Sequence, residues 1–368
     1  MKIRCEKAAL CDAVTVVGRV VPGHSSLPAL EGIFIRAGAG ALSLFGYDLD
    51  TGISTRIEAE VSEPGEIVLP AKVLLDISRR MPGEFVSISS GDRCLTELVS
   101  GAAEYTILGI PSDEFPEFPK LGDAAEVTLP QPLLRSMIEQ TIFAVSQSDS
   151  KPVHTGSLFE IEADGTFSLV SVDGYRLALR REKVAPDSPM RFVVPGRALN
   201  EISRVLSDTE GEVSIRVSKK HAIVKIGSFE IFTRLLEGDF LDYQSAIPKN
   251  GSVRVRVNTR EFVDSIERTG LLISDRIKSP MRVHFAQDEI LMTCSTALGR
   301  ASDRLSARTE GEELDMGFNN RYLLDALRNA DCDEVVLEIS GALSPMKILP
   351  VEGDSFLFLV LPVRLKAE

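Results

Sequence analysis

The sequence predicts an α+β protein built from three repeated domains, each with two helices packed on antiparallel sheets, because one amphipathic pattern occurs three times. Residues 67–77 (IVLPAKVLLDI) return as residues 192–202 (FVVPGRALNEI) and again as residues 316–326 (MGFNNRYLLDA). The steps between the copies are 125 and 124 residues. Repeats of this length indicate a duplicated domain, because each copy is large enough to bury its own core.

Other positions keep the same register, so the match is not confined to one stretch. Asp48 follows a short apolar run and returns as Asp173, and Thr296 takes this place in a weaker third copy. Acidic loops rich in proline or glycine at residues 111–119 and 242–251 separate the repeats. The simplest alternative is a generic α+β domain duplicated only for size. The joints predict domains at residues 1–120, 121–248 and 249–368.

Each repeat has two helical patterns set among strand-like runs. Alternating apolar residues at 213–217 and 335–339 are typical of half-buried strands. Pro70 and Pro195 stand where a first helical turn tolerates a missing amide hydrogen, and Asn319 or Asn320 can cap the third copy. The first helices are expected at residues 6–20, 131–146 and 259–272, and the second helices at 71–81, 196–206 and 320–330.

Composition is that of a soluble globular chain, with 44% hydrophobic and 26% charged residues among 368. No segment approaches the roughly 20 apolar residues that cross a bilayer, and charged residues interrupt the opening segment where a signal peptide would be apolar. We therefore expect a cytoplasmic protein. The five cysteines are scattered and the four histidines lack metal-ligand spacing, so neither a disulfide framework, a metal nor a cofactor is expected.

A catalytic site is not expected either. Acidic residues are plentiful enough for a paired-carboxylate hydrolase. The repeat, however, keeps Asp48 and Asp173 and loses the acid at Thr296, so it does not single out one site. The Gly38-Ala-Gly40 segment lacks the Lys-Ser or Lys-Thr of a phosphate loop and is better interpreted as a hairpin turn.

The second helix of each repeat carries two basic residues seven positions apart. Seven residues are nearly two helical turns, so both side chains share one face, while apolar residues on the other face pack on the sheet. We call these residues the basic stripe; they are Lys72 and Arg79, Arg197 and Arg204, and Arg321 and Arg328, with Arg80 added in the first copy.

Two interpretations of the basic stripe are open. Asp76, Glu201 and Asp325 lie between the basic residues, at spacings that allow intrahelical ion pairs. Alternatively, the stripe contacts phosphates weakly and without base recognition, because it offers charges but no donor and acceptor code. The net charge of −13 makes three basic faces unusual in this chain and favours the second interpretation.

The chain resembles the bacterial sliding clamp family, the β subunit of DNA polymerase III, over essentially its full length. The segments that carry this resemblance are residues 27–28 (LP), 66–71 (EIVLPA), 173–178 (DGYRLA), 240–243 (FLDY), 247–249 (IPK) and 361–365 (LPVRL).

The resemblance implies a head-to-tail homodimer that forms a ring of six clamp domains around double-stranded DNA, with helices lining the hole. Such a clamp slides without sequence specificity, tethers the polymerase for processivity and catalyses nothing. By resemblance Tyr105, Leu271 and Leu272 belong to the dimer interface. An acidic ring would repel DNA except at the helix-lined hole.

The resemblance also implies a cleft that takes short linear peptides from the polymerase catalytic subunit, the clamp loader and repair proteins. Apolar walls and backbone groups suit such a peptide. Without the resemblance, residues 360–363 would be interpreted as an ordinary edge strand of the core. The cleft positions are Val172, Gly174, Tyr175, Arg176, Leu177, Leu241, Ala246, Val360, Leu361, Pro362, Val363 and Arg364.

Some positions depart from the family pattern. Leu241, Ser245 and Pro345 replace a Pro, an Arg and a Ser, so the peptide preference is expected to differ. Among the family's DNA-contact positions, Lys72 keeps its charge, whereas His24 and Ser148 replace an Arg and a Gln. Pro152 and Val153 replace a pair of tyrosines, and Lys151 beside them offers a charge instead. The tail at residues 366–368 extends past the usual ending. A protein-binding scaffold with ion-paired helices is the alternative to a DNA-encircling clamp.

Overall fold

The computed structural model describes residues 1–118, 121–186, 188–274 and 279–365. They form two compact units, one of residues 1–134 with 197–235 and one of residues 135–196 with those from 236 onward. The tail at 366–368 lies outside the described residues. The division into domains at residues 120 and 248 stays a prediction.

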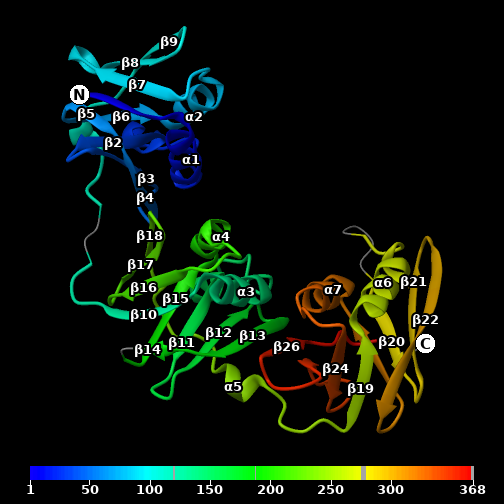
Figure 1. The fold of residues 1–368 in the computed structure, drawn as a ribbon. Helices are drawn as coiled ribbons and strands as arrows, with labels where there is room; N and C mark the ends of the chain where they lie inside the picture. The colour runs from blue at the N-terminus through cyan, green and yellow to red at the C-terminus, as the bar shows by residue number, and fades with distance from the viewer. Residues whose placement is uncertain (119–120, 187, 275–278, 366–368) are drawn as a thin grey trace. The chain divides into compact units, whose positions relative to one another are not determined.

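The first unit contains two antiparallel sheets (Figure 1). One has the order β5 (Glu60–Glu63), β1 (Lys2–Glu6), β7 (Phe85–Ser90), β8 (Leu95–Ser100) and β9 (Ala103–Leu108). The other runs through β10 (Ala125–Pro130), β16 (Glu212–Val217), β17 (His221–Ile226), β18 (Phe229–Arg234), β4 (Thr51–Glu58), β3 (Ala41–Tyr47), β2 (Gly32–Gly38) and β6 (Gly65–Pro70).

Helices α1 (Lys7–Val17) and α2 (Ala71–Arg80) lie side by side in this unit, and α4 (Gly196–Val205) belongs to it as well (Figure 1). Leu74 and Ile77 bury one face of α2, as its amphipathic pattern predicts. Short 3₁₀ turns cover Gly18–Val20, Pro28–Glu31, Asp92–Cys94 and Ser112–Glu114.

The second unit contains one sheet of twelve strands. Their order is β15 (Met190–Pro195), β11 (Gly156–Ile161), β12 (Thr166–Val172), β13 (Arg176–Lys183), β26 (Phe356–Val360), β25 (Met346–Pro350), β24 (Glu334–Ile339), β19 (Val253–Asn258), β22 (Gly299–Glu310), β21 (Glu289–Thr296), β20 (Met281–Phe285) and β23 (Leu314–Phe318). A further short strand, β14, covers Ala185–Pro186.

Helices α6 (Thr259–Gly270) and α7 (Asn320–Arg328) lie side by side in the second unit (Figure 1). Asn258 caps α6, and Asn319 caps α7 by accepting the Arg321 amide at 3.0 Å. The remaining helical segments are α3 (Gln131–Ile142), α5 (Tyr243–Ala246) and the 3₁₀ turn Pro152–Thr155.

All six predicted helices are present, but each ends earlier than predicted. The first passes into a 3₁₀ turn at Gly18, and the amides of Ala144 and Leu271 bond three residues back, to Thr141 and Arg268. Such bonds tighten the chain after the last α-helical turn, and apolar periodicity does not distinguish them from helix. The hairpin turn predicted at residues 38–40 is confirmed, with Ala39 and Gly40 at positive φ.

Consecutive repeats are joined by strand pairing, at positions that we call junctions. In the first unit β18 pairs antiparallel with β4, and Thr233 lies opposite Thr51. In the second unit β26 pairs in the same way with β13, and Val360 lies opposite Arg176. Thr51 and Arg176 are 125 residues apart, so each junction uses the same strand of its repeat.

Candidate nucleic-acid interface and peptide-binding surface

The basic stripe of α2 keeps exposed charges. Lys72 and Arg79 are exposed, and neither has an ion pair within the residues that the structure describes. Arg80 instead pairs with Asp76 of the same helix at 2.9 Å. An unpaired cation on a helix face is free to contact a phosphate, whereas Arg80 would first have to leave its carboxylate.

The stripe of α4 is engaged in ion pairs. Arg204 pairs with Glu201 at 2.6 Å, as the intrahelical interpretation predicts. Arg197 pairs outside its helix, with Asp48 at 2.9 Å. The Asp48 side chain is only 7% exposed, so this contact has a buried acidic partner and an exposed basic one.

The stripe of α7 differs again. Arg328 pairs with Glu267 of α6, and Arg321 is exposed on the first turn. Asp325 forms an ion pair with Arg176, outside its own helix. The predicted intrahelical pairing is therefore right for Asp76, with Arg80, and for Glu201, but Asp325 pairs outside its helix.

The remaining predicted DNA positions lie in loops. His24 is exposed before a 3₁₀ turn, with its Nδ1 3.3 Å from a Glu31 carboxylate oxygen. Ser148 and Lys151 are exposed in the segment after α3, and Ser148 hydrogen-bonds with Ser150. These loop side chains could offer DNA weak polar contacts, but they do not form a preorganised phosphate site.

Arg176 lies at the centre of the predicted peptide surface. The turn before it begins at Asp173, whose Oδ1 accepts the amides of Tyr175 at 2.9 Å and Arg176 at 3.1 Å. Gly174 between them has φ +91°, which glycine adopts without strain. The Arg176 Nε donates to Asp173 Oδ2 at 3.0 Å, and the same guanidinium pairs with Asp325 of α7.

Aromatic rings complete the surroundings of Arg176. Its guanidinium lies 4.7 Å from the ring centre of Tyr322 and 5.5 Å from that of Phe143. Tyr175 stacks on Tyr322 with 5.9 Å between ring centres, although its side chain remains largely exposed. Burial, followed by the Asp173 charge, raises the pKa of Tyr322, so its phenol stays neutral near pH 7.

The apolar part of the surface joins three segments. Val172 and Leu177 pack with Phe240 and Tyr243 in one buried cluster, so residues 240–246 lie beside the start of β13. The Leu361 amide donates to the Tyr175 carbonyl at 2.9 Å. Side chains that remain exposed along this surface are Tyr175, Leu241, Ala246, Val363 and Arg364.

The edge-strand interpretation of residues 360–363 is wrong. Val360 is fully buried at the end of β26, an interior strand between β13 and β25. Leu361 and Pro362 follow this strand and are half-buried, and the Val363 amide bonds to the Gly317 carbonyl at 2.7 Å. Residues 361–363 therefore leave the sheet beside Arg176, where they can form one side of the predicted peptide surface.

The predicted interface residues are exposed apolar or aromatic side chains. Tyr105 lies on β9, the last strand of its sheet. Leu271 follows α6 and is 81% exposed, and Leu272 beside it is half-buried. Exposed leucine and tyrosine on a strand edge and a helix end are typical of surfaces that another chain covers.

Other kinds of site find little support. Among the described residues, no group of three or more His, Cys, Asp or Glu side chains could hold a metal ion. Burial raises the pKa of Cys5 to about 12, so this thiol is not a nucleophile near neutral pH. Within the same residues no helix has the length and apolar character to span a bilayer.

Three repeats of two helices on antiparallel sheets, joined by strand pairing and carrying basic helix faces, define the class of DNA clamps. The family descriptions that match are the N-terminal domain of the DNA polymerase III beta subunit over residues 1–119, its central domain over 128–242 and its C-terminal domain over 244–364. The chain belongs to the DNA polymerase III beta subunit family, whose members are the beta sliding clamps.

Similar proteins agree over the whole chain. The beta sliding clamp of Bacillus subtilis is 31% identical over 99% of this chain and 100% of its own length. That of Halalkalibacterium halodurans is 33% identical over 95% of this chain and 96% of its own. A crystal structure of the Bacillus subtilis DNA polymerase sliding clamp superposes with a TM-score of 0.96 at 31% identity, covering 100% of both chains.

These matches confirm the predicted family, the α+β class with three clamp domains, and the role of a non-catalytic DNA sliding clamp in replication. Sequence reasoning missed Tyr322, Phe143 and Asp325, which surround Arg176. Of these three, the sequence singled out only Asp325, whose spacing from Arg321 and Arg328 predicted an ion pair within its own helix.

Proposed function

We propose that two copies of this chain close head to tail into a ring around double-stranded DNA. The observation that carries the proposal is the pair of junctions. Each joins a strand that follows an Asp-initiated turn to the last strand of the next repeat. The same strand of the third repeat, β22, and the last strand of the first repeat, β9, would join two chains in the same way.

Within this proposal the three clamp domains comprise residues 1–120, 121–248 and 249–368, and the ring works in the cytoplasm. DNA would contact exposed cations of the helix faces without base recognition. The surface around Arg176 would bind linear peptides of the polymerase catalytic subunit, the clamp loader and repair proteins. Leu241, Ser245 and Pro345 would then set its peptide preference.

Retention on closed DNA tests the ring. After loading onto a nicked circular plasmid, the protein is expected to stay bound through gel filtration in high salt and to be released when the plasmid is linearised. A topological ring leaves only over a free end, whereas a protein-binding scaffold would show no difference between the two DNA forms. Equal release from circular and linear plasmid would contradict the ring.

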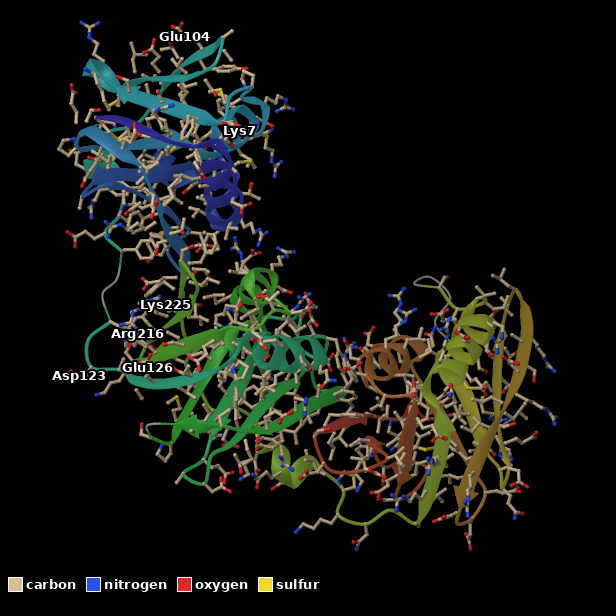
Figure 2. All side chains as sticks on the ribbon, in the orientation of Figure 1. Lys7, Glu104, Asp123, Glu126, Arg216 and Lys225 are labelled. Carbon is tan, nitrogen blue, oxygen red and sulfur yellow. The ribbon has the colours of Figure 1, made fainter. Side chains whose placement is uncertain are left out.

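Replacing Lys72 and Arg79 together with glutamine is expected to weaken non-specific DNA affinity and flatten its salt dependence. The slope of log K against log salt should fall by about 0.9 for each phosphate that the helix no longer neutralises. The measurement is DNA affinity of the unloaded protein at several salt concentrations. Lys225→Gln, which removes one exposed cation from β17 (Figure 2), is the matched control and should leave the slope unchanged. An equal change in both proteins would argue against the α2 stripe.

A further inference from the structure

The two junctions within the chain begin with the same turn. Asp48 Oδ1 accepts the amides of Asp50 at 3.0 Å and Thr51 at 2.6 Å. Asp173 Oδ1, 125 residues later, accepts the corresponding amides of Tyr175 and Arg176. In both repeats this turn leads into the strand that pairs with the next repeat. The first carboxylate oxygen therefore fixes the turn and leaves the second one available.

The second oxygen connects the turn to the second helix of the next repeat. Asp48 Oδ2 pairs directly with Arg197 on α4 at 2.9 Å. Asp173 Oδ2 holds Arg176, which in turn pairs with Asp325 on α7. Both contacts include side chains that are mostly buried, with Arg176 only 12% exposed. Each junction within the chain thus combines strand pairing with a charged contact between turn and helix.

The third repeat keeps the turn but not the charge. Thr296 takes the place of the two aspartates, and its Oγ1 accepts the Leu298 amide at 3.1 Å. Beyond the turn, β22 pairs with β21 along residues 299–306, while β19 pairs with β22 only along residues 307–310. The other edge of residues 299–306 is thus the counterpart of the edges that β4 and β13 use at the junctions.

The first repeat supplies the complementary half. β9 is the end strand of its sheet, and the Glu104 side chain points to solvent from it (Figure 2). Lys72 on α2 corresponds to Arg197, because the repeat step is 125 residues. In the described part of the chain Lys72 has no ion-pair partner. In a head-to-tail ring the helix carrying Lys72 would face the turn at Thr296 of the other copy.

We propose that Thr296 leaves the junction between two copies without the carboxylate that connects turn and helix at both junctions within the chain. The interchain junction is thereby weaker than the other two, and Thr296 sets how readily the ring separates there. This inference rests on the proposed head-to-tail ring. It also explains why Lys72 remains available to DNA, whereas its counterpart Arg197 is held by Asp48.

The test is a gain of affinity in Thr296→Asp. A carboxylate at this position should pair with Lys72 of the second copy and lower the dimer Kd about fivefold, the upper range for a partly exposed ion pair. Thr296→Asn keeps the turn without the charge and should dimerise like the wild type. Analytical ultracentrifugation at low salt measures the Kd, and the gain should shrink as salt screens the pair.

Lys72→Gln completes the cycle, because the gain from Thr296→Asp should vanish in that background. A gain that persists there would come from another cation, such as Arg300 on the same hairpin, and would overturn the proposal. An equal gain in Thr296→Asn, or no gain in Thr296→Asp, would overturn it too. If the wild-type protein neither dimerises nor stays on circular DNA, the ring itself is wrong, which is a different result from a dimer that ignores residue 296.

Discussion

Replacing Arg176 with alanine is expected to abolish binding of linear peptides and to lower the free energy of unfolding by about 2–3 kcal/mol. The guanidinium serves two carboxylates, those of Asp173 and Asp325, and also lies over the Tyr322 ring. Removal leaves Asp173, which is 13% exposed, without its cationic partner. It also removes the contact that holds the β13 start against α7, where Tyr175 stacks on Tyr322.

Peptide affinity should be measured by fluorescence polarisation, with labelled short peptides that tile the sequence of the polymerase III catalytic subunit of the same organism as probes. Arg176→Lys is expected to bind more weakly than wild type yet better than Arg176→Ala, because an ammonium keeps the charge but cannot bond two carboxylates through a planar fork. Once loaded, Arg176→Lys should stay on circular DNA as long as the wild type, because the change affects peptide binding and not ring closure. Wild-type peptide affinity in Arg176→Ala would refute the assignment.

Asp325→Asn separates positioning from direct contact. If Asp325 acts only by orienting Arg176, Asp325→Asn should lower peptide affinity less than Arg176→Ala does. Asp325→Glu should keep part of the affinity that Asp325→Asn loses. The double variant Asp325→Asn with Arg176→Ala should then bind the peptide no more weakly than Arg176→Ala alone, because both changes disrupt the same interaction with the peptide. Additive losses would instead indicate that Asp325 contacts the peptide itself.

The helices and the repeat could be predicted from the sequence because both are local or periodic. Leu74 and Ile77 recur at helical spacing, and the 125-residue step shows the same pattern at Leu199 and Ile202. Helix ends were predicted less accurately, because the change to hydrogen bonds between residues three apart, as from the Ala144 amide to the Thr141 carbonyl, leaves no pattern of apolar residues. Periodicity reports which face is buried, and not how the last turn closes.

Spacing along a helix predicted the ion pair of Glu201 but not that of Asp325. Asp325 is suitably spaced for Arg321 and Arg328, yet it pairs with Arg176, 149 residues away. That contact exists because β26 pairs with β13 and brings the turn at Asp173 to α7. The same cause explains Tyr322, which looks like an ordinary helix residue until the junction brings Tyr175 and Arg176 against it.

The segment that leads out of the first repeat is attached to a junction by aromatic packing. Phe118 lies with its ring centre 5.0 Å from Tyr47, 5.6 Å from Phe45 and 5.8 Å from Phe232. Phe232 belongs to β18, which pairs with β4. A β-carbon at Gly52 on β4 would overlap the Phe118 ring, so this glycine leaves space for it. One phenylalanine therefore fills the side of the junction that strand pairing alone leaves open.

Phe118→Ala is accordingly expected to lower the free energy of unfolding by about 2–4 kcal/mol, because it removes a half-buried ring and leaves its aromatic neighbours in contact with water. Gly52→Ala should also lower the free energy of unfolding, but by overpacking, since its new methyl group displaces the same ring. Urea unfolding followed by tyrosine fluorescence measures both. Phe115→Ala is the matched control, because Phe115 packs against the same cluster but, among the described residues, has one ring contact, with Phe34, where Phe118 has three, so its loss should cost less. If Phe118→Ala and Phe115→Ala unfold at the same urea concentration, packing at the β4 and β18 junction does not depend on Phe118.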